Sequence, residues 1–285
     1  MKRTSGQIAK QTLRMGGKTV FNTIMLVFSI TCIFPIIWII YSSFKTKDEF
    51  MMDIMSLPQQ PQLGSYEKAF SSGSMQTYFF NSIFNTVITV VLVIFLAFCI
   101  AYVLARYTFK GRNFIYTMFI VGMLVPVYSL IVPLFIQFKS IGLYDKLGTL
   151  ILPYIALRLP LSIFLFESYI RTIPFELEEA AYIDGAGPIR TMFKIIFPIC
   201  MPVTSTVLIL AFLDTWNEFP FALVLNTSES LRTLPVGLTG FYGQYTTDYT
   251  TLMAALVVSI LPVIIVYFIF RNKIIQGMTA GAVKG

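Results

Sequence analysis

The sequence contains no histidine, and only 14 of its 285 residues are acidic. Histidine is the commonest general base in enzymes and a preferred zinc ligand. Most enzyme and metalloprotein interpretations therefore lose the side chain on which they depend. We expect no catalytic residue, no metal site and no cofactor in this chain.

Cysteine is also scarce. Cys32, Cys99 and Cys200 all lie in apolar stretches, and an odd number argues against a disulfide framework. We expect these thiols to be inert packing groups.

An intact phosphate-binding loop is missing as well. The segment "GGKT" at 16–19 resembles the end of such a loop, but Thr12 stands where the pattern needs its first glycine, and no strand precedes it. Any ATP hydrolysis linked to this chain must come from another chain.

Charged residues make up only 12% of the chain, whereas 56% is hydrophobic. This composition is typical of a bundle of membrane spans. A spanning helix needs roughly 20 apolar residues, and β-barrel strands would be shorter and would alternate. The sequence predicts an all-α membrane protein with six transmembrane helices, at about 20–44, 80–105, 113–138, 147–170, 195–217 and 249–270.

The orientation follows from the Lys and Arg residues, which accumulate in short cytoplasmic loops. Most of the 21 lie on the cytoplasmic side if the N-terminus is inside. Both termini are then cytoplasmic, with a tail over 1–19, and so is the loop 171–194. The net charge of +7 reflects this bias, and we expect membrane lipid, not nucleic acid, around the chain.

The loop 171–194 contains the acidic segment "ELEEAAYIDGAG", residues 176–187. Pro174 suits the first turn of a short helix, Gly185 can provide a left-handed stop, and Pro188 can start a second helix. The small and acidic residues fall on neighbouring helix faces, Leu177, Ala180, Ala181 and Asp184 on one, and Glu176, Glu179 and Ile183 on the other. From local physics alone, a solvated loop and a docking surface are equally good interpretations.

The wider spacing favours docking. Glu179, Ala180 and Ala181, followed at fixed intervals by Gly185, Ile195 and Pro198, resemble the "EAA" motif of the membrane subunits of ABC importers. Phe197 replaces the leucine that the family has before the proline, a mild departure.

Further landmarks narrow the resemblance to the carbohydrate branch, the second-permease type related to the maltose system. They are "AYVLARYTFKGR" (101–112), "FELEEAAYIDGAG" (175–187), "FLDTWNEFPFAL" (212–223), "TLPVGL" (233–238) and "GMTAGAVKG" (277–285). The resemblance implies a type I ABC importer permease fold over 20–285, in a bacterial cell membrane.

The resemblance also implies a function without catalysis in this chain. The chain would form half of a translocation path for a sugar or oligosaccharide, paired with a second, homologous permease in a heterodimer. Two copies of a cytoplasmic ATPase would bind the ATP and Mg, and an extracytoplasmic binding protein would deliver the substrate. The residues that would couple to the ATPase are Glu178, Glu179, Ala180, Ala181, Asp184, Gly185, Ile195 and Pro198.

Candidate substrate contacts come from the fourth and fifth predicted spans, whose apolar stretches contain charged residues or end among them. Arg158 lies near the middle of the fourth span, two residues before Pro160, where a charge usually faces protein or a water-filled path. The alternative is an ion pair with an acid of a partner subunit. Trp216, Asn217 and Glu218 combine an aromatic ring with polar groups suited to a sugar, although Trp is also common at membrane boundaries. Arg158 leaves open whether the sugar is neutral or acidic.

Glu167 precedes Arg171 by four residues near the inner end of the same span. We expect an ordinary ion pair between these two side chains along the helix.

Two long outer loops, 45–79 and 220–248, fit a docking role for the binding protein, with Tyr242, Gln244 and Tyr245 as candidate contacts. Simple solvated linkage is the alternative.

Two other functions remain open at this stage. One is an ABC permease for a solute other than a sugar. The other is an ion-coupled secondary transporter, which the lack of an acidic relay beside Arg158 disfavours.

Overall fold

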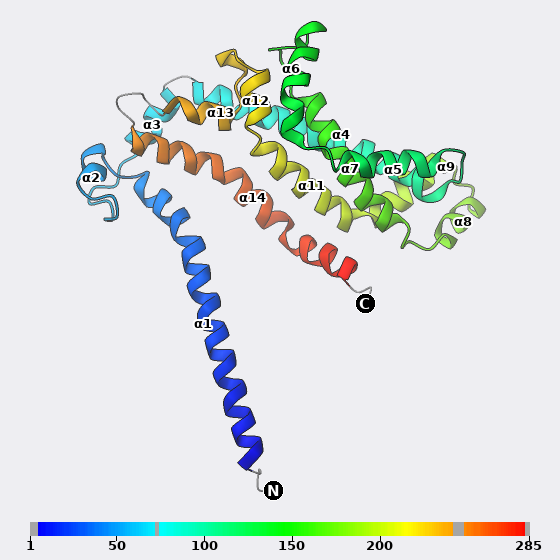
Figure 1. Ribbon diagram of the computed structural model, residues 1–285, viewed down its shortest axis with the longest axis horizontal. Helices are drawn as coiled ribbons and strands as arrows, with labels where there is room; N and C mark the ends of the chain where they lie inside the picture. Colours follow the sequence, from blue (N-terminus) through cyan, green and yellow to red (C-terminus); the bar gives the residue numbers. More distant parts are fainter. Residues whose placement is uncertain (1–4, 72–73, 242–247, 283–285) are drawn as a thin grey trace. The chain divides into compact units, whose positions relative to one another are not determined.

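A computed structural model describes residues 5–71, 74–241 and 248–282, with side chains from residue 18 to residue 271 (Figure 1). Every regular element in these ranges is a helix, so the expected all-α class is confirmed. The chain divides into two compact units. Residues 1–69 and 243–257 form the first, and residues 70–242 and 258–285 form the second.

The first unit contains the N-terminal helix α1 (Ser5–Ser42), the short helices α2 (Lys47–Met52) and α3 (Gly64–Ser71, up to residue 69), and the start of α14 (Tyr249–Ala282). Thr46 and Glu49 form a capping box at the start of α2. Lys45 is fully buried and donates hydrogen bonds to the carbonyls of Asp53 and Ile54 at 2.9 and 3.1 Å. This lysine therefore fastens the loop after α2 to the end of α1.

The second unit is built on one long helix, α4 (Ser74–Arg106). The elements that follow are α5 (Arg112–Gly122), η1 (Val127–Leu130), α6 (Ile131–Ser140), α7 (Ile151–Ile170), α8 (Glu176–Ile183), α9 (Pro188–Thr191), η2 (Met192–Ile196), α10 (Phe197–Ile199), α11 (Met201–Trp216), α12 (Pro220–Leu225), η3 (Glu229–Leu231), α13 (Leu234–Leu238), η4 (Thr239–Phe241) and the rest of α14. Of these, η2 is a π-helix.

Among the described residues, four helical stretches are long and apolar enough to cross a membrane, namely Lys18–Ser42, Ser74–Arg106, Ile151–Ile170 and Tyr249–Arg271. Two further pairs qualify only as bent spans. Arg112–Gly122 and Val127–Ser140 meet at 96°, and Pro188–Ile199 and Met201–Trp216 meet at 77°. The number of spans is thus four, or up to six with the bent pairs, and helices form most of each of the six stretches predicted from the sequence, with a break at 123–126 and a start at residue 151 rather than 147. Their limits in a bilayer remain a prediction.

Prolines explain both bends, because a proline has no N–H for the helix ladder and its ring clashes with the preceding turn. Pro126 follows a tight turn in which Met123, Leu124 and Val125 donate to the carbonyls three residues earlier. In the second pair, α11 begins directly after Cys200, with Pro202 in its first turn.

The core of the second unit lies where α7 and α11 pack against α4 (Figure 1). Val93, Ala97 and Ala101 are fully buried at intervals of four, so one face of α4 admits close approach. Phe98, on the same helix, packs edge to face against Phe166 of α7 and Phe197 of α10, with ring centroids 5.7 and 4.9 Å apart.

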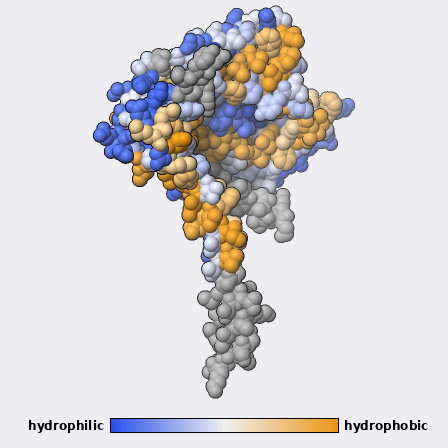
Figure 2. Space-filling view, turned by 60° about the vertical axis from the view of Figure 1, so that its left-hand side comes forward, coloured by the Kyte–Doolittle hydropathy of each residue, from blue (hydrophilic) through white to orange (hydrophobic). Residues whose placement is uncertain are grey.

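Large apolar side chains also reach the surface. Hydrophobic residues cover broad areas of the face shown in Figure 2. Among the exposed hydrophobic side chains of the second unit are Val91 and Phe95 of α4 and Phe114 of α5. Such a surface is expected of helices that meet lipid or another membrane subunit.

Candidate functional site

The acidic segment folds into α8, which ends as the sequence predicts. Gly185 has a φ of +80° and donates its N–H to the carbonyl of Tyr182 at 3.0 Å, while the N–H of Ala186 reaches the carbonyl of Ala181 at 2.9 Å. These two bonds form a Schellman motif, in which a left-handed residue closes the helix. Pro188 is the first residue of α9, also as expected.

The coupling residues proposed from the sequence differ in exposure. Glu179, Ala180, Asp184 and Gly185 are exposed, whereas Ala181 is buried against the body of the chain. Of the two later motif residues, Ile195 is half-buried and Pro198 is exposed.

Two exposed isoleucines beside these residues were not singled out as coupling residues. Ile183 is 86% exposed and Ile189 is 73% exposed, on either side of the turn that Gly185 makes. Large apolar side chains so exposed outside the apolar helices are typical of an interaction surface. Their signal in the sequence was partial: each stands within two residues of the Gly185 turn or Pro188, but the loop also contains other apolar residues, such as Leu177.

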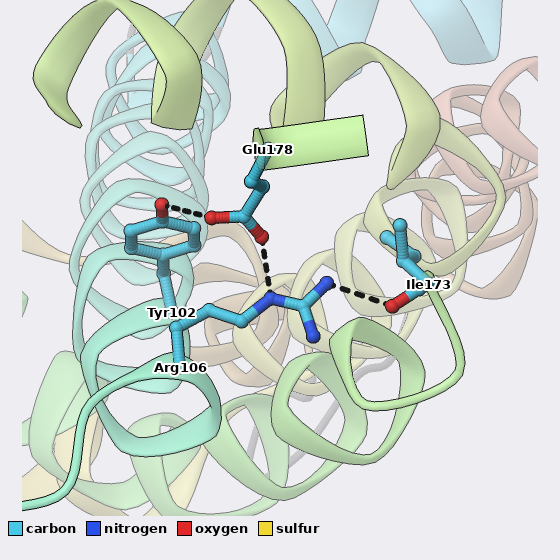
Figure 3. A network of polar contacts seen from close by, with 4 residues as sticks. All are labelled: Tyr102, Arg106, Ile173 and Glu178. Atoms are coloured by element: carbon cyan, nitrogen blue, oxygen red, sulfur yellow. Dashed lines mark hydrogen bonds and ion pairs between the residues drawn. The ribbon is translucent and has the colours of Figure 1, made fainter. Parts of the chain in front are cut away.

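Glu178 has a different place from its neighbours. Its side chain is only 1% exposed, and its carboxylate accepts hydrogen bonds from the Tyr102 hydroxyl at 2.7 Å and from Nε of Arg106 at 2.5 Å (Figure 3). Arg106 also donates from Nη2 to the carbonyl of Ile173 at 2.9 Å. A buried charge costs little only when it is paired and hydrogen-bonded, as here. Glu178 therefore holds α8 on the C-terminal end of α4 and is not itself available to a partner.

A second carboxylate lies nearby. Glu167 of α7 pairs with Arg171 as the sequence predicts, and Nη2 of Arg112 lies 3.9 Å from the same carboxylate. Arg106 and Arg112 both belong to the landmark "AYVLARYTFKGR". This stretch thus supplies one cation to each of the two buried acids, Arg106 to Glu178 and Arg112 to Glu167, a link that the sequence did not reveal.

A cavity of about 570 Å³ opens between the end of α11 and the middle of α7. It is lined by Pro126, Val127, Tyr128, Leu157, Arg158, Leu213, Asp214, Asn217, Glu218, Phe219, Pro220 and Phe221. Three of the four residues expected along a substrate path, Arg158, Asn217 and Glu218, line it.

Trp216 does not line this cavity. Its side chain is 2% exposed, its Nε1 donates to the carbonyl of Ser259 at 3.1 Å, and its ring packs against Phe79 and Phe212. Trp216 is two residues from Asp214, about 200° around the helix, so its ring faces away from the cavity and serves packing.

Glu218 lines the cavity, but its carboxylate is already hydrogen-bonded to other parts of the chain. Its carboxylate accepts hydrogen bonds from the N–H groups of Phe221 and Ala222, at 2.7 and 3.0 Å, and from the Tyr154 hydroxyl at 2.5 Å. It thus caps the first turn of α12, where free N–H groups and the helix dipole favour an anion.

Arg158 has a partner within its own chain. Its Nε lies 3.4 Å from Oδ2 of Asp214, and its Nη2 donates to the carbonyl of Asp214 at 3.1 Å. From the sequence we expected Arg158 to line a substrate path, with an acid of a partner subunit as the alternative, and the pairing with Asp214 was not predicted. The signal was an opposite charge in the next apolar stretch.

Three further candidates were expected to contact a binding protein. Tyr242, Gln244 and Tyr245 fall outside the described residues. Within the described residues, no group of three or more Cys, Asp and Glu side chains could hold a metal ion.

Comparison with known proteins identifies the family. Residues 97–280, more than half of the chain, match the family described as "Binding-protein-dependent transport system inner membrane component". The chain belongs to this family. It is a membrane subunit of an ABC transporter, without catalytic activity of its own, and ATP is hydrolysed by a separate subunit.

The chain is 38% identical over 254 residues to the sulfoquinovosyl glycerol transport system permease protein of Agrobacterium fabrum, covering 89% of both chains. It is 34% identical over 264 residues to the trehalose/maltose transport system permease protein of Thermococcus litoralis, covering 91% of this chain and 94% of that protein. Among solved structures, a chain of a bacterial ABC transporter for the acidic polysaccharide alginate superposes with a TM-score of 0.81 at 24% identity, over 95% of this chain and 99% of that one. The permease therefore has the ABC importer permease fold.

Proposed function

We propose that this permease forms half of the translocation path of an ATP-driven importer for a sugar or oligosaccharide. The substrate class is supported by what the related permeases are named for. A sulfoquinovosyl glycerol permease and a trehalose/maltose permease both align over about nine-tenths of the chain. The cavity that contains Arg158, Asp214 and Asn217 is the segment of the path on this subunit. Its mixture of apolar walls with a few polar groups suits a small polar ligand.

The coupling surface is α8 with the turn that follows it. Exposed Glu179, Ala180 and Asp184 together with Ile183 and Ile189 would seat in a cleft of the ATPase. The apolar side chains supply most of the affinity, since exposed ion pairs contribute only about 0 to 1 kcal/mol each. Glu178 acts as a positioning residue, because it fixes α8 to α4 through Arg106.

The complete transporter would contain this chain, a second permease of the same family, two ATPase subunits that bind ATP and Mg, and an extracytoplasmic binding protein. Both termini would lie in the cytoplasm, which puts the coupling turn on the side of the ATPase and the loop after α6 on the outer side. ATPase closure would then rock the two permease halves as rigid bodies.

The coupling assignment is tested by Ile183→Asp in the assembled transporter. We expect loss of most of the ATPase that co-purifies with the permease, and loss of ATP-driven uptake. Ile141→Asp is the matched control, because Ile141 is also an exposed isoleucine at the end of a helix, 57% exposed, but it follows α6. Equal recovery of the ATPase with both variants would contradict the assignment.

A further inference from the structure

The pair Arg158–Asp214 lies where two cavities meet. Besides the cavity of about 570 Å³, a narrow one of about 50 Å³ runs along α7 and α11. The narrow one is lined by residues one and two turns further toward the end of α7 and the start of α11, such as Leu161, Leu165 and Val207. Leu157, Arg158 and Asp214 line both. A solute that follows this face of the subunit passes the pair as it leaves the wider space.

Arg158 and Asp214 are the charged side chains that such a solute would contact. Of the three charged residues around the wider cavity, Glu218 turns its carboxylate to the N–H groups of α12. Arg158 and Asp214 remain, and they are of opposite sign and 3.4 Å apart. The side chain of Asp214 is 54% exposed, whereas that of Arg158 is only 16% exposed. The carboxylate is therefore presented more openly than the guanidinium.

This arrangement suits an uncharged, hydroxyl-rich solute. A sugar hydroxyl is both a donor and an acceptor, so neighbouring hydroxyls can donate to the Asp214 carboxylate and accept from the Arg158 guanidinium. An anionic sugar gains no net attraction, because the nearest cation is already compensated and the more exposed group repels it.

We propose that Asp214 is a specificity-determining residue that neutralises Arg158 at the neck between the two cavities and makes this half of the path selective for neutral over acidic sugars. The proposal rests on the proposed function, since it takes the two cavities as part of the translocation path. Arg158 alone left open whether the sugar is neutral or acidic, and this proposal favours a neutral sugar.

The test measures the electrostatic potential at the neck without needing the transported sugar. Asn217 lines the wider cavity, is exposed, and lies three residues from Asp214 on the helical surface, so Asn217→Cys places a reporter thiol beside the pair. In the assembled transporter, the thiol reacts separately with an anionic and a cationic methanethiosulfonate reagent. The same chain without the reporter gives the background rate of its own cysteines.

With the natural pair, we expect the two reagents to react at similar rates after correction for their intrinsic reactivities. Asp214→Asn should raise the ratio of anionic to cationic rate about tenfold, because it leaves the cation of Arg158 uncompensated. Arg158→Gln should lower the ratio by a similar factor, and the double variant should return it toward the starting value. Opposite shifts cannot arise from partial unfolding, which would change both rates alike. Glu176→Gln is the control for charge alone, since this carboxylate is exposed and does not line the cavity.

Two results would overturn the proposal, and they are distinguishable. A reactive thiol that strongly prefers the anionic reagent and is insensitive to Asp214→Asn would show that Arg158 dominates, as an acidic sugar requires. A thiol that reacts with neither reagent would show that the cavity is not on a water-filled path, and the assignment of the path would fail together with the specificity.

Discussion

Gly237 shows how a single residue can be fixed by its neighbour. A Cβ at this position of α13 would lie 2.0 Å from Cδ2 of Tyr78 on α4, a distance that no side chain tolerates. Tyr78 is buried and cannot withdraw freely, because its hydroxyl donates to Glu229 at 3.1 Å. Glu229 also accepts from the Ser74 hydroxyl, and these hydrogen bonds lower the pKa of its carboxyl. The glycine therefore lets α13 and the preceding loop pack on α4.

Gly237→Ala is expected to destabilise the protein by about 1 to 3 kcal/mol, because the added methyl group overpacks a filled contact. Thermal unfolding of the purified protein in detergent measures the loss. Gly240→Ala is the matched control three residues later, since nothing lies within 4 Å of a Cβ there. Equal unfolding temperatures for the two variants would show that the contact between α13 and α4 is looser than described.

At the scale of elements, α8, the proposed coupling helix, is held by buried charge more than by apolar contact. Most of the large side chains on or beside α8 are exposed, and Glu178 and Ala181 are its buried residues. The network of Glu178, Tyr102 and Arg106 is thus the main attachment of α8 to α4 (Figure 3). Under the proposed coupling role, a force applied by the ATPase to α8 would reach α4 through this network.

Glu178→Gln is expected to loosen α8 while the rest of the bundle stays folded. Removing one member of a buried pair leaves an uncompensated charge and typically costs about 3 to 5 kcal/mol. Hydrogen exchange in a peptide covering 176–183 should therefore accelerate strongly, with little change in peptides from the middle of α4.

Glu176→Gln is the control within the same helix, because Glu176 is exposed. It removes an equal charge without touching the network. If both variants exchange alike, the attachment of α8 does not depend on the pair with Arg106.

At the scale of the whole molecule, the chemistry that drives transport belongs to another subunit. The described residues offer no metal cluster, and the segment "GGKT" lacks the first glycine of a phosphate-binding loop. Membership of the family assigns ATP hydrolysis to a separate subunit. An ion-coupled mechanism would need acids along the path, and in the cavities Asp214 is paired and Glu218 is a helix cap.

Uptake by the reconstituted transporter is therefore expected to require ATP and to stop with vanadate. Collapse of proton and sodium gradients should leave the rate within about twofold, because no step uses them. Liposomes without the binding protein are the control for leakage. Uptake that continues without ATP but follows an imposed ion gradient would contradict this prediction.

Local patterns predicted much of the fold and part of the site. The left-handed turn at Gly185, the start of α9 at Pro188 and the pair of Glu167 with Arg171 all depend on residues within a few positions of each other. The bends in the third and fifth stretches were not predicted, although Pro126 and Pro202 were visible. A proline can either kink a span or end it, and packing decides which.

The sequence by itself determined the membrane class, the number of apolar stretches, the family and the place of the turn at Gly185, because composition, hydrophobic length and motif spacing are properties of neighbouring residues. Only the tertiary structure decided which carboxylates are free. In the sequence, Glu178, Glu218 and Asp214 are all acids near motifs of interest. In the structure, Glu178 anchors α8, Glu218 caps α12 and Asp214 pairs with Arg158. Their partners lie on other helices or across a turn, and a charge has its role set by the nearest opposite charge or free N–H group in space.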